Sequence, residues 1–292
     1  MEKIKLKAYA KINIGLDVIG KRPDGYHEVN MVMQTVTLHD TVYLSIRTKP
    51  EITVRTNLYY LPCNENNLAY QAAKLLMEEF HLTNGIDIRL KKEIPVAAGM
   101  AGGSTDAATV LVGMNRLFEL GLTRKELMKR GVQLGADVPY CIMRGTALAE
   151  GIGEQLTKLP PMPKCVVLVA KPPVSVSTKN VYELLDGMHK QEHPDIPGIL
   201  EGIKCGKLEQ IIPHMGNILE SVTVAMHPQI MYLKELMLRE GAMQAMMSGS
   251  GPAVFGFFYQ KEQAEKVANL LKEKNLVQQV NVTGIFNVTE RK

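Results

Sequence analysis

A glycine-rich turn at residues 95–106, P-V-A-A-G-M-A-G-G-S-T-D, constrains this chain more than any other stretch. An alternating apolar segment at 86–90 predicts a strand before it, and the apolar composition from about Thr105 to Leu117 predicts a buried helix after it. Backbone N–H groups at a helix N-terminus lack intrahelical partners, and glycine lets a ligand approach them closely. The pattern therefore predicts an anion site, most simply for phosphate. For such a turn taken alone, a purely structural turn with Ser104 as N-cap stays open.

Two other phosphate-binding motifs are excluded. The chain has no G-x-x-x-x-G-K-[ST], and glycines at positions 99, 102 and 103 do not form G-x-G-x-x-G. The turn instead resembles the second motif of the GHMP kinases, the family of galactokinase, homoserine, mevalonate and phosphomevalonate kinases. In that family the loop wraps the phosphates of ATP.

Length and composition favour a globular protein that binds small anionic molecules. The chain has 292 residues, of which 46% are hydrophobic, enough for two domains with cores of their own. A net charge of +4 argues against a nucleic-acid surface. Four scattered cysteines argue against a zinc site or a disulfide framework and suit the cytoplasm. We see no signal peptide or membrane-length apolar run, so we expect no membrane partner.

The order of predicted elements indicates an α+β protein with two domains. Pro-Pro-Met-Pro at 160–163 is the best linker, and we place the boundary there, giving domains 1–160 and 161–292. The second half follows the strand and helix order of a ferredoxin-like domain. The first half combines many strands with helices, predicted as strands at 4–17, 29–38, 40–48, 52–55 and 86–90, helices at 67–80, 105–117 and 123–134, and a strand pair or strand and turn at 140–150.

Three segments match the GHMP pattern in the family's order. They are residues 7–16 near the N-terminus, the glycine turn, and S-G-S-G-P at 248–252 before an apolar strand. One glycine-rich loop is weak evidence, but three motifs in order, spanning nearly the whole chain, identify the chain as a member of the family. The resemblance implies an N-terminal ATP-binding domain of the ribosomal-protein-S5-like α+β type, a ferredoxin-like C-terminal domain, and a kinase that phosphorylates a small alcohol.

Three further segments resemble one branch of the family, which phosphorylates a cytidine-diphosphate-linked sugar alcohol in isoprenoid (terpenoid) biosynthesis. They are P-D-G-Y-H at 23–27, G-A-D-V-P at 135–139 and P-P-V-S-V-S-T at 172–178. The implied acceptor site has cytosine between two aromatic side chains and a histidine at the base edge, and comprises Asn13, Tyr26, His27, Asp137, Thr178, Tyr182, Ser248 and Gly249. The alternatives are a kinase of the mevalonate or homoserine type and a non-catalytic nucleotide sensor on the same fold.

Two charged residues are candidates for the chemistry. Asp137 follows a predicted helix and precedes Val-Pro, where capping of a turn and action as a base both stay open on the residues alone. Lys11 lies on an apolar strand, where the alternative is a solvent-facing side chain. Asn13, two residues on, shares its face. The resemblance implies that Asp137 is the catalytic base and that Lys11 stabilises the developing charge.

The ATP site is implied to lie on the glycine turn, with a few residues nearer the adenine. Its residues are Pro95, Val96, Ala97, Ala98, Gly99, Met100, Ala101, Gly102, Gly103, Ser104 and Thr105 on the turn, with Asn67, Leu68 and Lys92 beside the adenine. We expect the Asp106 side chain to turn away from the phosphates or to lie near the metal. ATP with Mg²⁺ is the expected co-substrate, with no tightly bound cofactor. The metal ligands are unknown, and a homodimer stays open.

Overall fold

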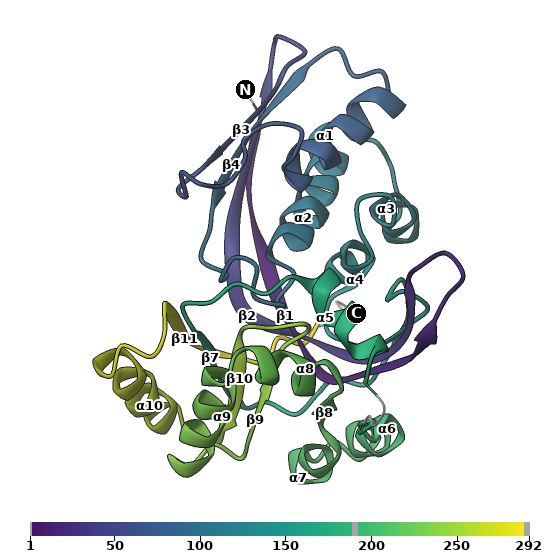
Figure 1. Ribbon diagram of the computed structural model, residues 1–292. Helices are drawn as coiled ribbons and strands as arrows, with labels where there is room; N and C mark the ends of the chain where they lie inside the picture. The colour runs from purple at the N-terminus through teal and green to yellow at the C-terminus, as the bar shows by residue number, and fades with distance from the viewer. Residues whose placement is uncertain (1, 189–191, 289–292) are drawn as a thin grey trace. The chain divides into compact units, whose positions relative to one another are not determined.

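The computed structural model describes residues 2–188 and 192–288, which fall into two compact units (Figure 1). The first unit comprises Met1–Ala10, Leu38–Val96 and Ala101–Met143, and the second comprises Lys11–Thr37, Ala97–Met100 and Arg144–Lys292. Strands β1 (Lys3–Lys21) and β2 (His27–Arg47) contribute residues to both. The units interleave along the chain, so they do not test the boundary at 160/161, which stays a prediction.

The first unit is a mixed sheet with helices on one face (Figure 1). Strand β4 (Gly85–Lys91) runs antiparallel to the end of β2 and parallel to β3 (Ile52–Thr56). Its helices are α1 (Leu68–Glu79), α2 (Gly102–Leu117), α3 (Arg124–Gly131) and α4 (Asp137–Met143). Helix α2 packs close to the sheet because Gly113 has no side chain and leaves room for Leu44. The same helix packs against α1 and α4.

Local sequence signals explain where two of these helices begin. The Asn67 side chain accepts a hydrogen bond from Ala69 N at 2.9 Å and caps α1. Thr123 and Glu126 form a reciprocal capping box at the start of α3, as their spacing predicts. Both starts are therefore confirmed.

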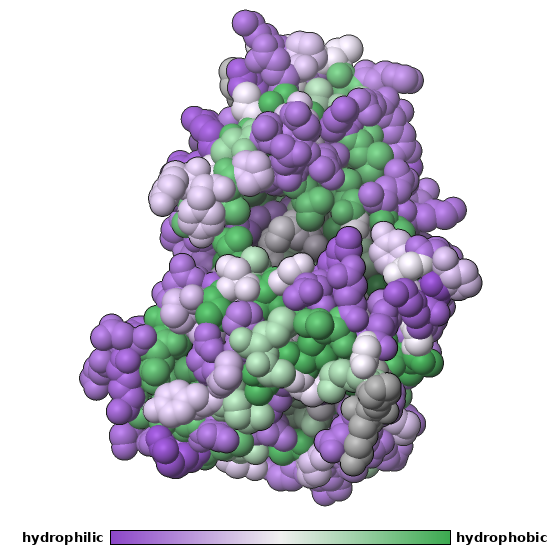
Figure 2. All heavy atoms as spheres, in the orientation of Figure 1, coloured by the Kyte–Doolittle hydropathy of each residue, from purple (hydrophilic) through white to green (hydrophobic). Residues whose placement is uncertain are grey.

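The second unit contains a four-stranded antiparallel sheet in the order β11-β7-β10-β9. In chain order these are the fourth, first, third and second strands, so the ferredoxin-like arrangement predicted for this half is confirmed. Helices α9 and α10 pack against this sheet, and α10 turns a hydrophilic surface outward (Figure 2). The strands are β7 (Val166–Lys171), β9 (Gln244–Met247), β10 (Val254–Phe258) and β11 (Gln279–Gly284), and the helices are α5 (Thr178–Asp186), α6 (Ile196–Cys205), α7 (Leu208–Ile211), η1 (Ile212–His214), α8 (Leu219–Met226), α9 (Gln229–Arg239) and α10 (Lys261–Glu273).

Parts of β1 and β2 complete the second unit together with three short strands. The hairpin of β5 (Thr146–Glu150) and β6 (Gln155–Lys158) pairs with β2 from Met31 to Gln34. Strand β8 (Gly216–Asn217) runs parallel to β1 at Gly15 and Leu16. The pairings fix the register of β1, which carries Lys11 and Asn13 on one face.

Some predictions of local structure are wrong. Residues 140–150 begin inside α4 and only then continue as β5, so the predicted strand pair is absent there. Pro139 does not break α4, because a residue in the first helical turn has no intrahelical partner for its N–H in any case. The two strands predicted at 29–38 and 40–48 are one long strand, β2, which ends at Arg47. Helix α2 begins at Gly102 rather than near Thr105, and α8 was not predicted.

Gly85 gives a direct test of the packing in the first unit. A Cβ atom there would lie 2.2 Å from Lys49 O and 2.3 Å from Glu51 O, and backbone oxygens cannot rotate away. We predict that Gly85→Ala lowers the free energy of unfolding by roughly 1–3 kcal/mol. Gly20→Ala is the control, because a Cβ at Gly20 meets nothing within 4 Å. Urea unfolding followed by circular dichroism checks both, and equal stability of the two variants would contradict this packing.

Candidate active site

The backbone of the glycine turn alternates between two conformations. Ala97, Gly99 and Ala101 have φ values of +49°, +74° and +57°, in the left-handed region. That region is unfavourable for alanine, and such strain is concentrated at functional sites. The residues between them, Ala98 and Met100, are buried. A backbone that alternates in this way directs successive N–H groups into one concavity, which is the geometry of an anion site.

Helix α2 starts directly after this turn. Its N-cap residue, Ala101, makes no side-chain capping bond, and Ser104 lies inside the first turn, so Ser104 is not the N-cap. In the described part of the chain, the first N–H groups of α2 therefore have no side-chain cap competing with a ligand. Leu68 lies beside this start, since a Cβ on Gly103 would be 3.5 Å from its Cδ1 atom. The structure thus brings the predicted adenine-side residue Leu68 next to the predicted phosphate turn.

The second and third motifs are in direct contact. Ser248 Oγ donates a hydrogen bond to Gly99 O at 3.0 Å. A Cβ atom on Gly99 would lie 1.9 Å from Ser248 O, so this approach requires glycine. The contact fixes the left-handed part of the turn against the loop at 248–252.

The side chains of Asn217 and Thr178 also hold the loop at 248–252. Asn217 Nδ2 donates to the carbonyl oxygens of Met247 and Gly249, at 2.9 and 2.8 Å. Thr178 Oγ1 lies 2.7 Å from Ser250 Oγ, which joins the loop to the start of α5. Sequence reasoning missed Asn217, because nothing near it in the chain resembles a motif.

Lys11 and Asn13 form a buried polar pair on β1. Their exposed fractions are 5% and 0%, so the solvent-facing alternative for Lys11 is wrong, and the shared face is confirmed. Lys11 Nζ donates to Asn13 Oδ1 at 2.7 Å, and Lys11 N donates to Met100 O at 3.2 Å. Burying an ammonium group costs free energy, which favours a functional reason for its presence.

Asp137 is the first residue of α4, not a loop residue as predicted. A carboxylate in the first turn of a helix interacts favourably with the helix dipole. Asp137 belongs to the first unit and Lys11 to the second. Their pairing in catalysis therefore stays a prediction.

Two of the three residues predicted for the cytosine site, His27 and Tyr182, come together with Asp186, which was not predicted. The His27 and Tyr182 rings pack with centroids 4.7 Å apart, and His27 Nε2 lies 2.7 Å from Asp186 Oδ1. Lys21 and then His27 hold the pKa of the Asp186 carboxyl below its ordinary value. Tyr26 precedes this group and is 61% exposed. Asp186 could have been found from its spacing, four residues after Tyr182 on the same helix.

Lys92 lies in a buried charge cluster, which we call the Asp40–Lys92–Asp106 cluster. Its Nζ atom contacts both carboxylates and lies 3.3 Å from Gly102 O. Burial raises the pKa of Asp106 to about 7; Lys92 opposes this shift and Asp40 adds to it. The two carboxylates outweigh burial at Lys92 and raise the pKa of its ammonium. Asp106 is therefore directed into the protein, and Asp40, which no local sequence pattern marks, completes the cluster.

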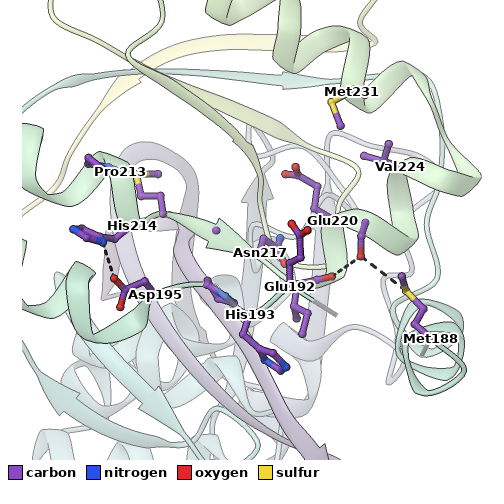
Figure 3. A pocket seen from close by; sticks show the side chains of 15 residues that line it. Met188, Glu192, His193, Asp195, Pro213, His214, Asn217, Glu220, Val224 and Met231 are labelled. Carbon is purple, nitrogen blue, oxygen red and sulfur yellow. Dashed lines mark hydrogen bonds and ion pairs between the residues drawn. The ribbon is translucent and has the colours of Figure 1, made fainter. Parts of the chain in front are cut away.

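A large pocket lies elsewhere, in the second unit. It has a volume of about 700 Å³ and is lined by parts of the second unit, including His193, Asp195, His214 and Glu220 (Figure 3). None of the predicted site residues lines it. In the described ranges, no group of three or more His, Cys, Asp or Glu side chains is arranged to hold a metal ion, and no helix is long and apolar enough to span a membrane.

Comparison with known proteins gives a consistent result. The chain matches the models "GHMP kinases N terminal domain" over residues 67–145 and "GHMP kinases C terminal" over residues 199–276. It is 56% identical over 286 residues to a 4-diphosphocytidyl-2-C-methyl-D-erythritol kinase of Lachnospira eligens, covering 98% of this chain and 99% of that protein. It is 46% identical over 284 residues to a protein of the same name from Clostridium perfringens, covering 97% and 99%.

Solved structures show the same relationship. A 4-(cytidine 5'-diphospho)-2C-methyl-D-erythritol kinase superposes with a TM-score of 0.83 at 29% identity, over 98% of this chain and 100% of that one. A homoserine kinase from Cytophaga hutchinsonii gives a TM-score of 0.74 at 21% identity, over 98% and 95%. The second similarity concerns the fold alone.

The cluster makes a testable contribution to stability. The folded-state pKa of Asp106 lies above its ordinary value of 3.8, so folding binds the proton more tightly. The stabilisation is fully present below about pH 4 and is lost as the pH rises through about 7. We predict that the stability of the parent falls relative to Asp106→Asn between pH 5 and pH 8. Urea unfolding at four pH values checks this, and parallel curves for the two proteins would contradict it.

Proposed function

The chain belongs to the GHMP kinase family, within the branch of the 4-diphosphocytidyl-2-C-methyl-D-erythritol kinases, and we propose that it carries out the reaction of that name. In this reaction the γ-phosphoryl group of ATP passes to the 2-hydroxyl of 4-diphosphocytidyl-2-C-methyl-D-erythritol, in the non-mevalonate route to isoprenoids. The observation that carries the proposal is the near full-length similarity to kinases of this name. The geometry of the individual residues supports each of its parts.

We assign the ATP phosphates to the N–H groups of the glycine turn and the first turn of α2. Left-handed backbone at alternate positions and a helix start without a side-chain cap, in the described part of the chain, both favour an anion there. Asn67 and Leu68 border the adenine in this proposal. The Lys92 ammonium is engaged by two carboxylates, so its role is to support the turn. Mg²⁺ enters on the ATP phosphates, and we assign it no protein ligand.

The acceptor is held by its cytidine end and its reacting end. Tyr26 and Tyr182 stack on the cytosine, and His27 hydrogen-bonds its edge while Asp186 orients the imidazole. At the other end, the diphosphate and the sugar bind to Ser248 and Gly249 of the loop at 248–252 and to Thr178 at the start of α5. These two ends explain why an acceptor without cytidine diphosphate would bind poorly.

The chemical step needs one base and one cation. In the proposal Asp137 accepts the proton of the 2-hydroxyl as its oxygen attacks the γ-phosphorus, and the bond to the β-phosphate oxygen breaks to release ADP. Lys11 stabilises the negative charge that develops on the attacking oxygen. Asn13, which accepts a hydrogen bond from Lys11 Nζ at 2.7 Å, orients the ammonium.

Two other functions were considered from the sequence. A kinase for a smaller acceptor of the mevalonate or homoserine type is disfavoured, because the similar curated proteins bear the name of the cytidine-linked substrate. A nucleotide sensor without catalysis is disfavoured by the presence of Lys11, Asp137 and the glycine turn together.

Tyr26→Ala tests the acceptor site. Stacking of an aromatic side chain on a base contributes roughly 1–3 kcal/mol. We predict that the variant raises the acceptor KM by about one to two orders of magnitude and leaves the KM for ATP nearly unchanged. Tyr232→Ala, at an exposed tyrosine on α9, is the control. Steady-state kinetics measure all three proteins, and an unchanged acceptor KM would remove Tyr26 from the site.

Lys11 and Asp137 are tested as a pair. Asp137→Asn keeps the shape but removes the base, and should lower kcat by roughly two to four orders of magnitude. Lys11→Met should cost a comparable factor, since electrostatic stabilisation is a large term. Because both act on one proton and one charge, the double variant should lose much less than the product of the two factors.

The controls separate chemistry from folding. Lys5→Met changes an exposed lysine on the same strand and should keep parental turnover. Thermal melts and ATP titration should be nearly parental for both single variants. A folded Asp137→Asn protein with parental kcat would show that Asp137 is structural.

A further inference from the structure

The Asp40–Lys92–Asp106 cluster is buried in the first unit and joins three elements. Asp40 lies on β2, Lys92 directly follows β4, and Asp106 lies in the first turns of α2. Their exposed fractions are 0%, 8% and 3%. One ammonium faces two carboxylates, so with both carboxylates ionised the cluster carries one surplus negative charge.

The cluster ties the start of α2 to the sheet. Asp40 Oδ1 accepts hydrogen bonds from the backbone N–H groups of Glu93 and Ile94, and Asp40 Oδ2 contacts Lys92 Nζ. Lys92 Nζ in turn contacts Asp106 Oδ2 and Gly102 O. The backbone of the first turn of α2 is therefore connected to β2 through a single ammonium group.

Asn57 fixes the backbone of Lys92 itself. Its amide accepts from Lys92 N at 2.7 Å and donates to Lys92 O at 3.2 Å. Lys92 is thus held at its backbone by Asn57 and at its ammonium group by the two carboxylates. A change in the charge of either carboxylate therefore acts on the contact between Lys92 Nζ and Gly102 O.

The surplus negative charge is poorly compensated at Asp106 Oδ1. Asp106 Oδ1 and Thr109 Oγ1 are among the buried side-chain atoms of the described ranges that have no hydrogen-bond partner. A buried carboxylate oxygen without a donor is costly, and protonation removes that cost. A negative charge within the first turns of α2 also opposes a phosphate bound at the same helix end. Neutral Asp106 is therefore the form compatible with both burial and a bound anion.

We propose that Asp40, Lys92 and Asp106 are positioning residues for the phosphate-binding turn, and that Asp106 takes up a proton when ATP binds there. The proposal rests on the proposed function, which places the ATP phosphates at this turn. The pKa of Asp106, raised to about 7 by burial, puts this proton uptake in the neutral range. Lys92 and Asp40 are the charged groups with the largest effects on Asp106.

The sign of the effect follows directly. Bound phosphate favours protonated Asp106, so above the pKa of the free protein ATP binding requires a proton from solution. ATP affinity should then fall as the pH rises from 6 to 8, by at most about tenfold per pH unit for one proton. Asp106→Asn is neutral at every pH and should not show this contribution. Asp40→Asn leaves one carboxylate for one ammonium. Because Asp40 raises the pKa of Asp106, this variant should show the pH dependence of ATP affinity at lower pH.

Titration calorimetry with ATP and Mg²⁺ tests the proposal on the full chain. Each protein is titrated between pH 6 and pH 8 in two buffers of different ionisation enthalpy, which counts the protons taken up. ATP itself titrates, but equally for all proteins, so the differences between them report on the protein. Asp87→Asn is the matched control: Asp87 is a carboxylate on β4 whose pKa is held below its ordinary value, against the opposing effect of burial, chiefly by hydrogen bonds from Thr53 and Arg55.

Near pH 7.5 we expect the parent and Asp87→Asn to take up as much as about one more proton per ATP bound than Asp106→Asn does. Between pH 6 and pH 8 their ATP affinity should fall by a factor roughly three to ten times larger than that of Asp106→Asn. Equal proton uptake and parallel affinity curves in parent and Asp106→Asn would overturn the proposal. Gly102→Val distinguishes failure of the phosphate assignment from failure of the proton linkage. If it weakens ATP binding while Asp106→Asn behaves as the parent, the phosphate assignment stands and the proton linkage fails. If it leaves ATP affinity unchanged, both fail.

Discussion

The left-handed backbone of the glycine turn is the constraint on which the rest of the site depends. Ala97 and Ala101 occupy a region that L-residues avoid, so something must hold them there. Ser248 supplies part of that restraint, because its hydroxyl bonds to Gly99 O and its own carbonyl oxygen occupies the space of a missing Cβ. The loop at 248–252 is held in turn by Asn217 and Thr178. The conformation of the phosphate turn is therefore determined by residues about 75 to 150 positions away in the chain.

A second network prepares the acceptor side. His27, Tyr182 and Asp186 come from two elements of the second unit and contact one another without a ligand. Asp186 accepts from both Lys21 and His27, so the imidazole has one preferred orientation before substrate arrives. Preorganised groups bind a ligand with less loss of conformational entropy. In our account this is why the cytidine end of the acceptor contributes to affinity although Tyr26 is largely exposed.

Much of the fold and the outline of the site could be predicted from the sequence, because those signals are local. The cap at Asn67 and the capping box at Thr123 depend on neighbouring residues, and the glycine turn is recognisable from its own composition. The ferredoxin-like arrangement follows from the order of strands and helices along the chain. The two-domain α+β fold of GHMP kinases is likewise confirmed by the family models and solved structures. Helix α4 was not predicted, because residues 140–150 were interpreted as a strand pair or a strand and turn. Pro139 lies in the first turn of α4, where a missing N–H costs no intrahelical hydrogen bond.

The partners of the site residues could not be predicted in the same way. Asp40 lies 52 residues from Lys92, and Asp186 lies 159 residues from His27. Such pairs follow from the packing of the sheet and of α5, and no local pattern marks them. The same reason explains why Lys92 was assigned to the adenine from its position in the chain, whereas its ammonium lies inside a buried cluster.

The central claim is that this chain phosphorylates an alcohol that it recognises through cytidine diphosphate. The most direct measurement is phosphoryl transfer from ATP to a panel of alcohols, comprising 4-diphosphocytidyl-2-C-methyl-D-erythritol, the same alcohol without the cytidine diphosphate group, mevalonate and homoserine. We predict a kcat/KM at least about a hundredfold higher for the cytidine-bearing alcohol, from stacking on its base. Equal or faster transfer to mevalonate or homoserine, or ATP binding without transfer to any of the four, would contradict the account.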